Sequence, residues 1–220
     1  MSFTEQLGDM LTFVRETLKD YRTDIENMRA VGYSKFDHTL RVMSWLKRLY
    51  EHSDFREEVS FEDVVIAAAF HDTGYSTLEN IPDHAAGSAV ICREYLEKDG
   101  VPEDRIRYIT ELVRLHSEKK RMRDPETDKG LLLLMEADVI DDTGALSVVT
   151  DCRIVQARAP QSGPEKALEH IRSFSYRYQA QAENPMVTPW GRQVWEEKSR
   201  LVKEFTAALE RDLPDGSFGV

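Results

Sequence analysis

The sequence predicts an all-α fold, a single-domain helical bundle with additional helices at both ends. Apolar residues recur three and four positions apart in most segments, which is the period of an amphipathic helix. Alternating Val, Ile and Thr segments bounded by turns, which are typical of strands, are absent. At 220 residues the chain is long enough for one good-sized core. It shows no internal repeat and no convincing domain boundary, so we expect residues 1–220 to form one domain.

Composition excludes several classes of partner. The net charge of −11 argues against a nucleic-acid polymer, although a local cationic cluster could still hold a small phosphorylated ligand. No apolar run approaches the roughly 20 residues that span a bilayer, and the first residues lack the features of a signal peptide. We therefore expect a cytoplasmic protein that does not enter membranes. Cys92 and Cys152 have no paired spacing and predict two reduced thiols.

Two helices are expected in the first fifty residues. Residues 3–29 repeat apolar side chains at helical spacing and predict an amphipathic helix that packs onto the core. Residues 34–37 then have the spacing of a capping box, and the segment after them carries apolar residues on one face. His38 opens this second helix and shares its inward stripe.

The third expected helix contains the first candidate functional residues. It starts in a box-like pattern at residues 60–63 and continues through an apolar run to His71 and Asp72, which we place on its buried side. Residues 73–75 end it. A carboxylate and an imidazole at the end of so apolar a run must be paired, hydrogen-bonded or metal-bound to offset their desolvation.

Two more expected helices have histidines at their ends. Asp83 can cap a helix that begins at His84 and stops at Gly100. Pro102 suits the first turn of the next helix, whose apolar stripe continues to His116. Four histidines therefore lie at the ends of apolar helical faces.

The second half of the chain is also expected to be helical. Residues 119–125 are polar and basic and predict a loop. Residues 131–138 form a short apolar run that periodicity alone could assign to helix or strand, and we take helix because strands are scarce elsewhere. Further helices are expected over 145–157, over 164–182 and from Thr188 through Leu209.

Two imidazoles and two carboxylates from three predicted helices are turned inward by their apolar stripes: His38, His71, Asp72 and Asp138. Converging in a core, they would form an open site for a divalent ion, namely Mn, Fe, Co, Ni, Zn or Mg. A lone histidine is more often an ordinary core or surface residue. For all four residues together, a metal site is favoured over ordinary core or surface roles.

The remaining histidines divide into two kinds. His84 and His116 are inward and could bind a second ion with Asp72 as the bridge, or donate hydrogen bonds to phosphate, so we expect one or two metal ions. His52 lies in a charged loop and His170 among charged residues, and we interpret both as ordinary core or surface residues.

Candidate catalytic and phosphate-contacting residues lie close to these ligands in the sequence. Asp141, one helical turn from Asp138, is the best candidate to orient water or to bind a ligand histidine. A basic segment just after His116 could contact substrate phosphate or could simply be a solvated loop. The phosphate candidates are Lys119, Lys120, Arg121 and, one turn after His38, Arg41.

The ordered ligands resemble the His, His-Asp, Asp signature of the HD-domain metal-dependent phosphohydrolases, in their small stand-alone bacterial form. The residues that support the match are 38–42, 71–74, His84, 116–117, 137–138, Asp141 and 144–145. The resemblance implies an HD-like core at about 30–150 and a C-terminal helical extension at 151–220, where 186–192 match more loosely. It departs at residues 136–141, Glu-Ala-Asp-Val-Ile-Asp, where the subgroup usually has Asp-Ala-Asp-Arg-Leu-Asp.

The resemblance implies hydrolysis of a small phosphorylated substrate, such as a nucleotide, at a phosphomonoester or pyrophosphate bond. Water activated by a divalent metal would attack phosphorus in line, with Asp72 and Asp141 as catalytic residues. Two alternatives stay open: a di-iron HD-type oxygenase, and a catalytically silent nucleotide- or metal-sensing module. The amphipathic first and last helices could also serve a homodimer.

Overall fold

The computed structural model describes residues 2–19, 34–77, 83–173 and 184–214, which form helices and no strand, so the all-α prediction is confirmed. The 3-10 helices in these ranges are η1 (Asp54–Glu57), η2 (Thr73–Thr77) and η3 (Lys119–Arg123). The α-helices are α1 (Phe3–Leu18), α3 (Lys35–Glu51), α4 (Phe61–Phe70), α5 (His84–Lys98), α6 (Glu103–Leu115), α7 (Lys129–Asp141), α8 (Ala145–Arg158), α9 (Pro164–Ser173) and α11 (Pro189–Asp212).

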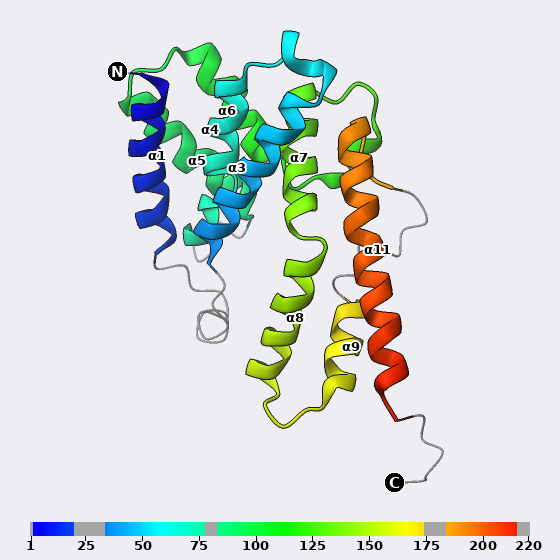
Figure 1. Ribbon diagram of the computed structural model, residues 1–220. Helices are drawn as coiled ribbons and strands as arrows, with labels where there is room; N and C mark the ends of the chain where they lie inside the picture. The colour runs from blue at the N-terminus through cyan, green and yellow to red at the C-terminus, as the bar shows by residue number, and fades with distance from the viewer. Residues whose placement is uncertain (1, 20–33, 78–82, 174–183, 215–220) are drawn as a thin grey trace.

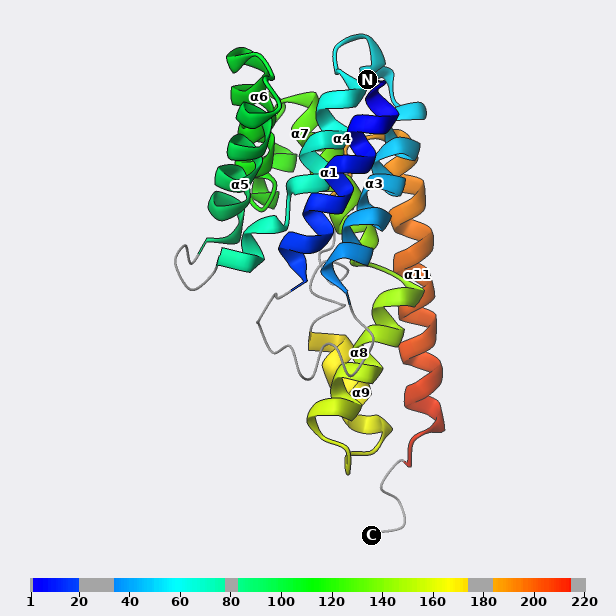
Figure 2. The same cartoon turned by 90° about the vertical axis from the view of Figure 1, so that its left-hand side faces the viewer.

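The helices α4 and α7 form the centre of the bundle. Every residue of α4 from Val64 to Phe70 is buried, as are nearly all of α7. A helix that is apolar all round has no solvent face, so it must be surrounded by other helices. α4 packs against α1, α3, α5, α6 and α7. Figure 2 shows the α5 and α6 pair at one edge of the bundle and α11 at the opposite edge.

The C-terminal part extends away from this bundle (Figure 1). The long helix α11 runs first beside α7 and then beside α8 and α9. A second, smaller cluster of buried apolar residues joins α8, α9 and α11: Val148, Ile171 and Val202. No helix among the described residues is both long and apolar enough to cross a membrane.

Most predicted helix starts have the expected caps. Ser34 accepts a hydrogen bond from the Asp37 backbone N–H, and Asp83 accepts from the first turn of α5. Thr188 caps α11, and Gly100 takes a φ of 71° just after α5. Residues 131–138 are helical, as predicted. The predicted segments 20–29 and 174–182 lie outside the described residues.

Three local predictions were wrong. The helix α4 ends at Phe70, so His71 is its C-cap and Asp72 lies beyond the helix. The chain tightens into η2 directly after Asp72, and the side chains of His71 and Asp72 are both buried. Pro102 precedes the first residue of α6 as its N-cap. Residues 119–123 form η3 and not a loop, because Met122 is buried and anchors them to the core.

Candidate metal centre

The four predicted ligands meet the two histidines predicted to bind a second ion or phosphate where α3 and α5 begin and where α4, α6 and α7 end. They fall into two groups whose nearest ligand atoms all lie within 4.8 Å of one another: His38, His71 and Asp138, and Asp72, His84 and His116. The helices α3, α4 and α7 position the first group, and α5 and α6 bring their histidines to the second. The structure therefore brings together the set that the sequence proposed.

The first group is built around two facing imidazoles. The Nε2 atoms of His38 and His71 are 3.4 Å apart. Asp138 Oδ1 lies 3.2 Å from the His38 Nε2 and 4.0 Å from the His71 Nε2. Both histidines are almost completely buried. Two nitrogens and a carboxylate oxygen at these separations suit a small divalent cation between them.

The second group repeats this pattern on the other side of Asp72. The Nε2 atoms of His84 and His116 are 3.4 Å apart, and each lies 3.7 Å from Asp72 Oδ1. The other oxygen, Oδ2, lies 3.5 Å from His38 Nε2 and 3.4 Å from His71 Nε2. Asp72 thus presents one oxygen to each group, which is the geometry of a bridging carboxylate.

Hydrogen bonds orient the three most buried rings. The Nδ1 of His71 donates to Ala68 O, and the Nδ1 of His116 to Val113 O, each across 2.7 Å. The Nδ1 of His38 lies 2.7 Å from Asp141 Oδ2. In a neutral ring, a proton on Nδ1 leaves the Nε2 lone pair aimed into the site. Lone pairs that face each other need a cation or a proton between them, so the donor set fits a metal.

The electrostatics of the site are strongly perturbed. Desolvation by itself would lower the pKa of His38, but hydrogen bonds to Asp138 and Asp141 outweigh it and raise the pKa to about 10. Desolvation lowers the pKa of His71 to about 4. Burial opposes the charge on Asp72, yet nearby cations, Lys35 first among them, hold its pKa well below the usual range. Carboxylates that stay ionised in a buried site are suited to hold a divalent ion.

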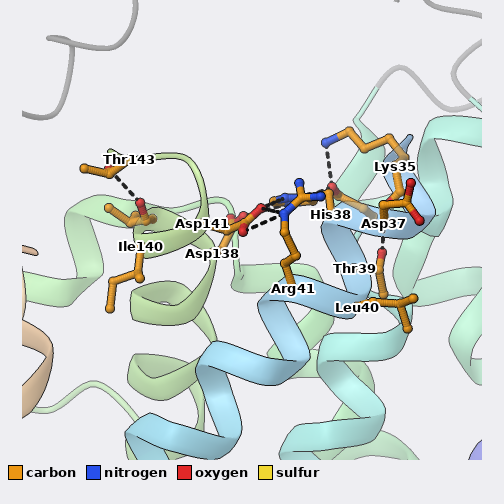
Figure 3. A network of polar contacts seen from close by, with 12 residues as sticks. Lys35, Asp37, His38, Thr39, Leu40, Arg41, Asp138, Ile140, Asp141 and Thr143 are labelled. Carbon is orange, nitrogen blue, oxygen red and sulfur yellow. Dashed lines mark hydrogen bonds and ion pairs between the residues drawn. The ribbon is translucent and has the colours of Figure 1, made fainter. Parts of the chain in front are cut away.

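Of the predicted phosphate contacts, two reach the site. Lys119 Nζ lies 2.5 Å from Asp138 Oδ2. Arg41 donates from Nε to both oxygens of Asp141, and Figure 3 shows Arg41 and His38 reaching this carboxylate from the same helix. Lys120 is exposed, and Arg121 donates to Glu118 at 2.8 Å, so the structure does not bring these two to the ligand atoms.

The two histidines set aside as ordinary lie elsewhere. His52 stacks on Trp190, with ring centroids 4.8 Å apart. His170 lies 3.4 Å from Asp151, between α8 and α9.

Sequence reasoning missed Lys35 and gave Glu136 no role. Lys35 Nζ lies 2.6 Å from Asp72 Oδ2, and its place one turn before His38 was the available signal. Glu136 is fully buried and accepts from the backbone N–H groups of Val187 and Thr188 and from the Thr188 hydroxyl. These hydrogen bonds hold the segment before α11 against α7. Glu136 lies two residues before Asp138 in that helix.

Comparison with known proteins agrees with this geometry. A family model described as HD domain matches residues 36–143. A search of curated proteins gives no significant match.

Several solved structures share the fold. A predicted HD superfamily hydrolase from an uncultured Thermotogales bacterium is 22% identical with a TM-score of 0.62, covering 96% of this chain and 99% of its own. An HD-superfamily hydrolase from Bacillus thuringiensis is 18% identical with a TM-score of 0.67, covering 96% and 98%. Bacillus subtilis YpgQ in complex with ADP is 18% identical with a TM-score of 0.67, covering 98% of both chains. At these identities the likeness concerns the fold alone.

Proposed function

Because the chain is an HD-domain protein, we propose that it is a divalent-metal-dependent phosphohydrolase that acts on a small phosphorylated substrate, with a nucleotide as the favoured class. The observation that carries this proposal is Asp72, whose two oxygens each face a pair of histidine Nε2 atoms. Shared carboxylates of this kind are suited to hold two divalent cations close together, as in enzymes that displace groups at phosphorus.

In this proposal each residue of the centre has a distinct role. Bound divalent ions supply a water of lowered pKa and polarise phosphoryl oxygens. His71 is held neutral by burial and offers its Nε2 lone pair, while Asp72 and Asp138 stay ionised. Asp141 acts through His38, whose ring it orients. Lys119 is close enough to neutralise charge that develops on a phosphoryl group held at the site.

Two observations support a nucleotide as the substrate class. YpgQ, which shares the fold, was solved in complex with ADP. The site also gathers cationic side chains, Lys35, Arg41 and Lys119, in a protein whose net charge is −11. A local cationic cluster on an acidic protein favours a compact anion, such as a di- or triphosphate, over a long polyanion.

The test is release of phosphate and pyrophosphate by metal-stripped protein over a panel of nucleotides and phosphomonoesters, with Mn, Mg, Co, Ni, Fe or Zn restored singly. Metal-dependent release is expected from the wild type and none from Asp72→Ala. The matched control is Asp104→Ala, because Asp104 is an exposed carboxylate paired only with Arg107 in the described part of the chain. The product identifies the bond that breaks.

Silence across the panel in metal-loaded protein would overturn the proposal. Oxygen uptake with bound iron would then favour the oxygenase, and tight nucleotide binding without turnover would favour the sensing module. Turnover retained in Asp72→Ala at unchanged metal content would show that the assigned ligands are wrong.

A further inference from the structure

Lys35 forms an ion pair inside the candidate metal centre. Its Nζ lies 2.6 Å from Asp72 Oδ2, and the exposed fractions of the two side chains are 14% and 5%. Lys35 lies in the first turn of α3, one turn before His38. A charge-assisted bond at this distance and burial is stronger than a surface pair, because little water competes for either partner.

The oxygen that Lys35 occupies is the one that faces the first ligand group. Asp72 Oδ2 lies 3.5 Å from His38 Nε2 and 3.4 Å from His71 Nε2. An ion held by those two nitrogens would draw on the same oxygen lone pairs as the ammonium. Two cations at one carboxylate oxygen repel each other, so their occupancies are coupled.

Lys119 differs from Lys35 in which carboxylate oxygen it contacts. It binds Asp138 through Oδ2, whereas the Oδ1 of the same carboxylate faces His38 and His71. Lys119 therefore holds the outer oxygen and leaves the inner one open to a metal. The two lysines have the same chemistry and pair with carboxylates of the same centre, but only Lys35 competes at the inner oxygen.

Tyr75 offers the Lys35 ammonium a second electrostatic partner. Lys35 Nζ lies 4.3 Å from the centroid of the Tyr75 ring. That ring stacks on His84 with centroids 4.5 Å apart and planes inclined by 19°. An ammonium over an aromatic face is held by cation–π attraction. When Asp72 Oδ2 is taken by a metal, Lys35 can therefore stay at the edge of the centre.

We propose that Lys35 is a resident counter-ion that competes with the metal for Asp72 Oδ2 and, once displaced, binds an anionic phosphoryl group of the substrate. This inference rests on the proposed function. An ammonium at the edge of the metal centre attracts anions, and a phosphoryl oxygen held at the centre is an anion within its reach. Lys35 thereby couples metal loading to substrate binding, so that the anion binds well only after the metal.

The first experiment measures Mn(II) binding by the electron paramagnetic resonance signal of the free ion in titrations of metal-stripped protein. Lys35→Met keeps the aliphatic stem and removes the competing charge, so Mn(II) affinity should rise roughly tenfold. Lys35→Arg should restore wild-type affinity. Lys47→Met, which removes an exposed lysine from the same helix, should leave Mn(II) affinity unchanged. Thermal unfolding of each variant verifies that it is folded.

The second experiment measures inorganic phosphate binding to the manganese-loaded proteins by calorimetry. Phosphate affinity should fall about tenfold in Lys35→Met and recover in Lys35→Arg, the opposite direction to the change in metal affinity. A general loss of structure would weaken both affinities together. Unchanged or weaker manganese binding by Lys35→Met, or unchanged phosphate binding, would overturn the inference.

The hydrolase activity and the role of Lys35 can be overturned separately. Tighter manganese binding by Lys35→Met with no turnover of any substrate would leave this inference standing and overturn the hydrolase. Turnover by the wild type with no tightening in Lys35→Met would do the reverse. A wild type that binds no manganese would overturn both.

Discussion

His38 and Asp141 are joined by a 2.7 Å hydrogen bond between Nδ1 and Oδ2, across 103 positions of sequence. The same carboxylate accepts from Arg41 Nε, so its charge is shared between the imidazole and a guanidinium. By accepting a hydrogen bond from Nδ1, the carboxylate favours the tautomer that has its proton on Nδ1. It also orients the ring so that Nε2 faces the centre. Asp141 is thus placed to fix the orientation of the His38 ring in the candidate metal centre.

Removing this carboxylate should weaken metal binding without removing a ligand. Asp141→Ala frees the His38 ring to rotate and to change tautomer, and metal affinity should fall about 10- to 100-fold. Manganese titration of the metal-stripped protein measures the change. Glu111→Ala removes an arginine-bound carboxylate from the exposed surface of α6 and should have no effect. Wild-type affinity in Asp141→Ala would contradict the positioning role.

Glu136 should be one of the most important polar residues for stability. Burial raises its pKa, although hydrogen bonds from Thr188 and Val187 oppose that rise. Glu136→Ala leaves three hydrogen-bond donors at Val187 and Thr188 without their acceptor. The free energy of unfolding should therefore fall by about 3 kcal/mol. Urea denaturation measures the loss. Glu196→Ala removes an exposed acceptor of Asn184 beside the same segment and should cost less than about 1 kcal/mol.

Gly74 sets how closely η2 approaches α5. A Cβ at this position would lie 1.9 Å from His84 O and 2.4 Å from Ser88 N, both backbone atoms. Gly74→Ala must push α5 away from Asp72, so unfolding free energy should fall by roughly 3 kcal/mol and turnover should fall with it. Gly8→Ala is the control, because nothing lies within 4 Å of its added Cβ. That change should be neutral or stabilising by up to about 1 kcal/mol.

Lys198 should make stability rise with pH. It donates to the carbonyls of Ile140 and Thr143 at the end of α7, and desolvation lowers its pKa to about 8. Between that value and the unfolded value of 10.5, the unfolded chain binds a proton that the folded protein has released. The unfolding free energy of the wild type relative to Lys198→Met should therefore increase from pH 8 to above pH 10.

The size of this increase is limited by the partial exposure of Lys198. After allowance for solvent screening it should be on the order of 2 kcal/mol. Urea denaturation of both proteins at several pH values measures the difference, in which the titration of other groups cancels. A difference that is flat or falls with pH would show that Lys198 is not desolvated.

Local pattern was sufficient for most helices and for choosing the histidines and aspartates that the structure brings together. The spacing of apolar residues and the caps at Ser34, Asp83 and Thr188 are read over a few neighbouring residues, and they predicted most helix starts. The same pattern placed four histidines at helix ends. It failed at His71 and Asp72, because whether a chain continues as α-helix or tightens into η2 depends on what packs against it.

Tertiary structure decided the arrangement around these ligands. Which oxygen of Asp72 faces which histidine pair, and that Lys35 and not Lys120 enters the centre, depend on distances between helices far apart in sequence. Periodicity records only which side of a helix faces inward. The sequence by itself therefore determined an all-α protein with a histidine and aspartate centre, while helix packing determined the pairing of charges within it.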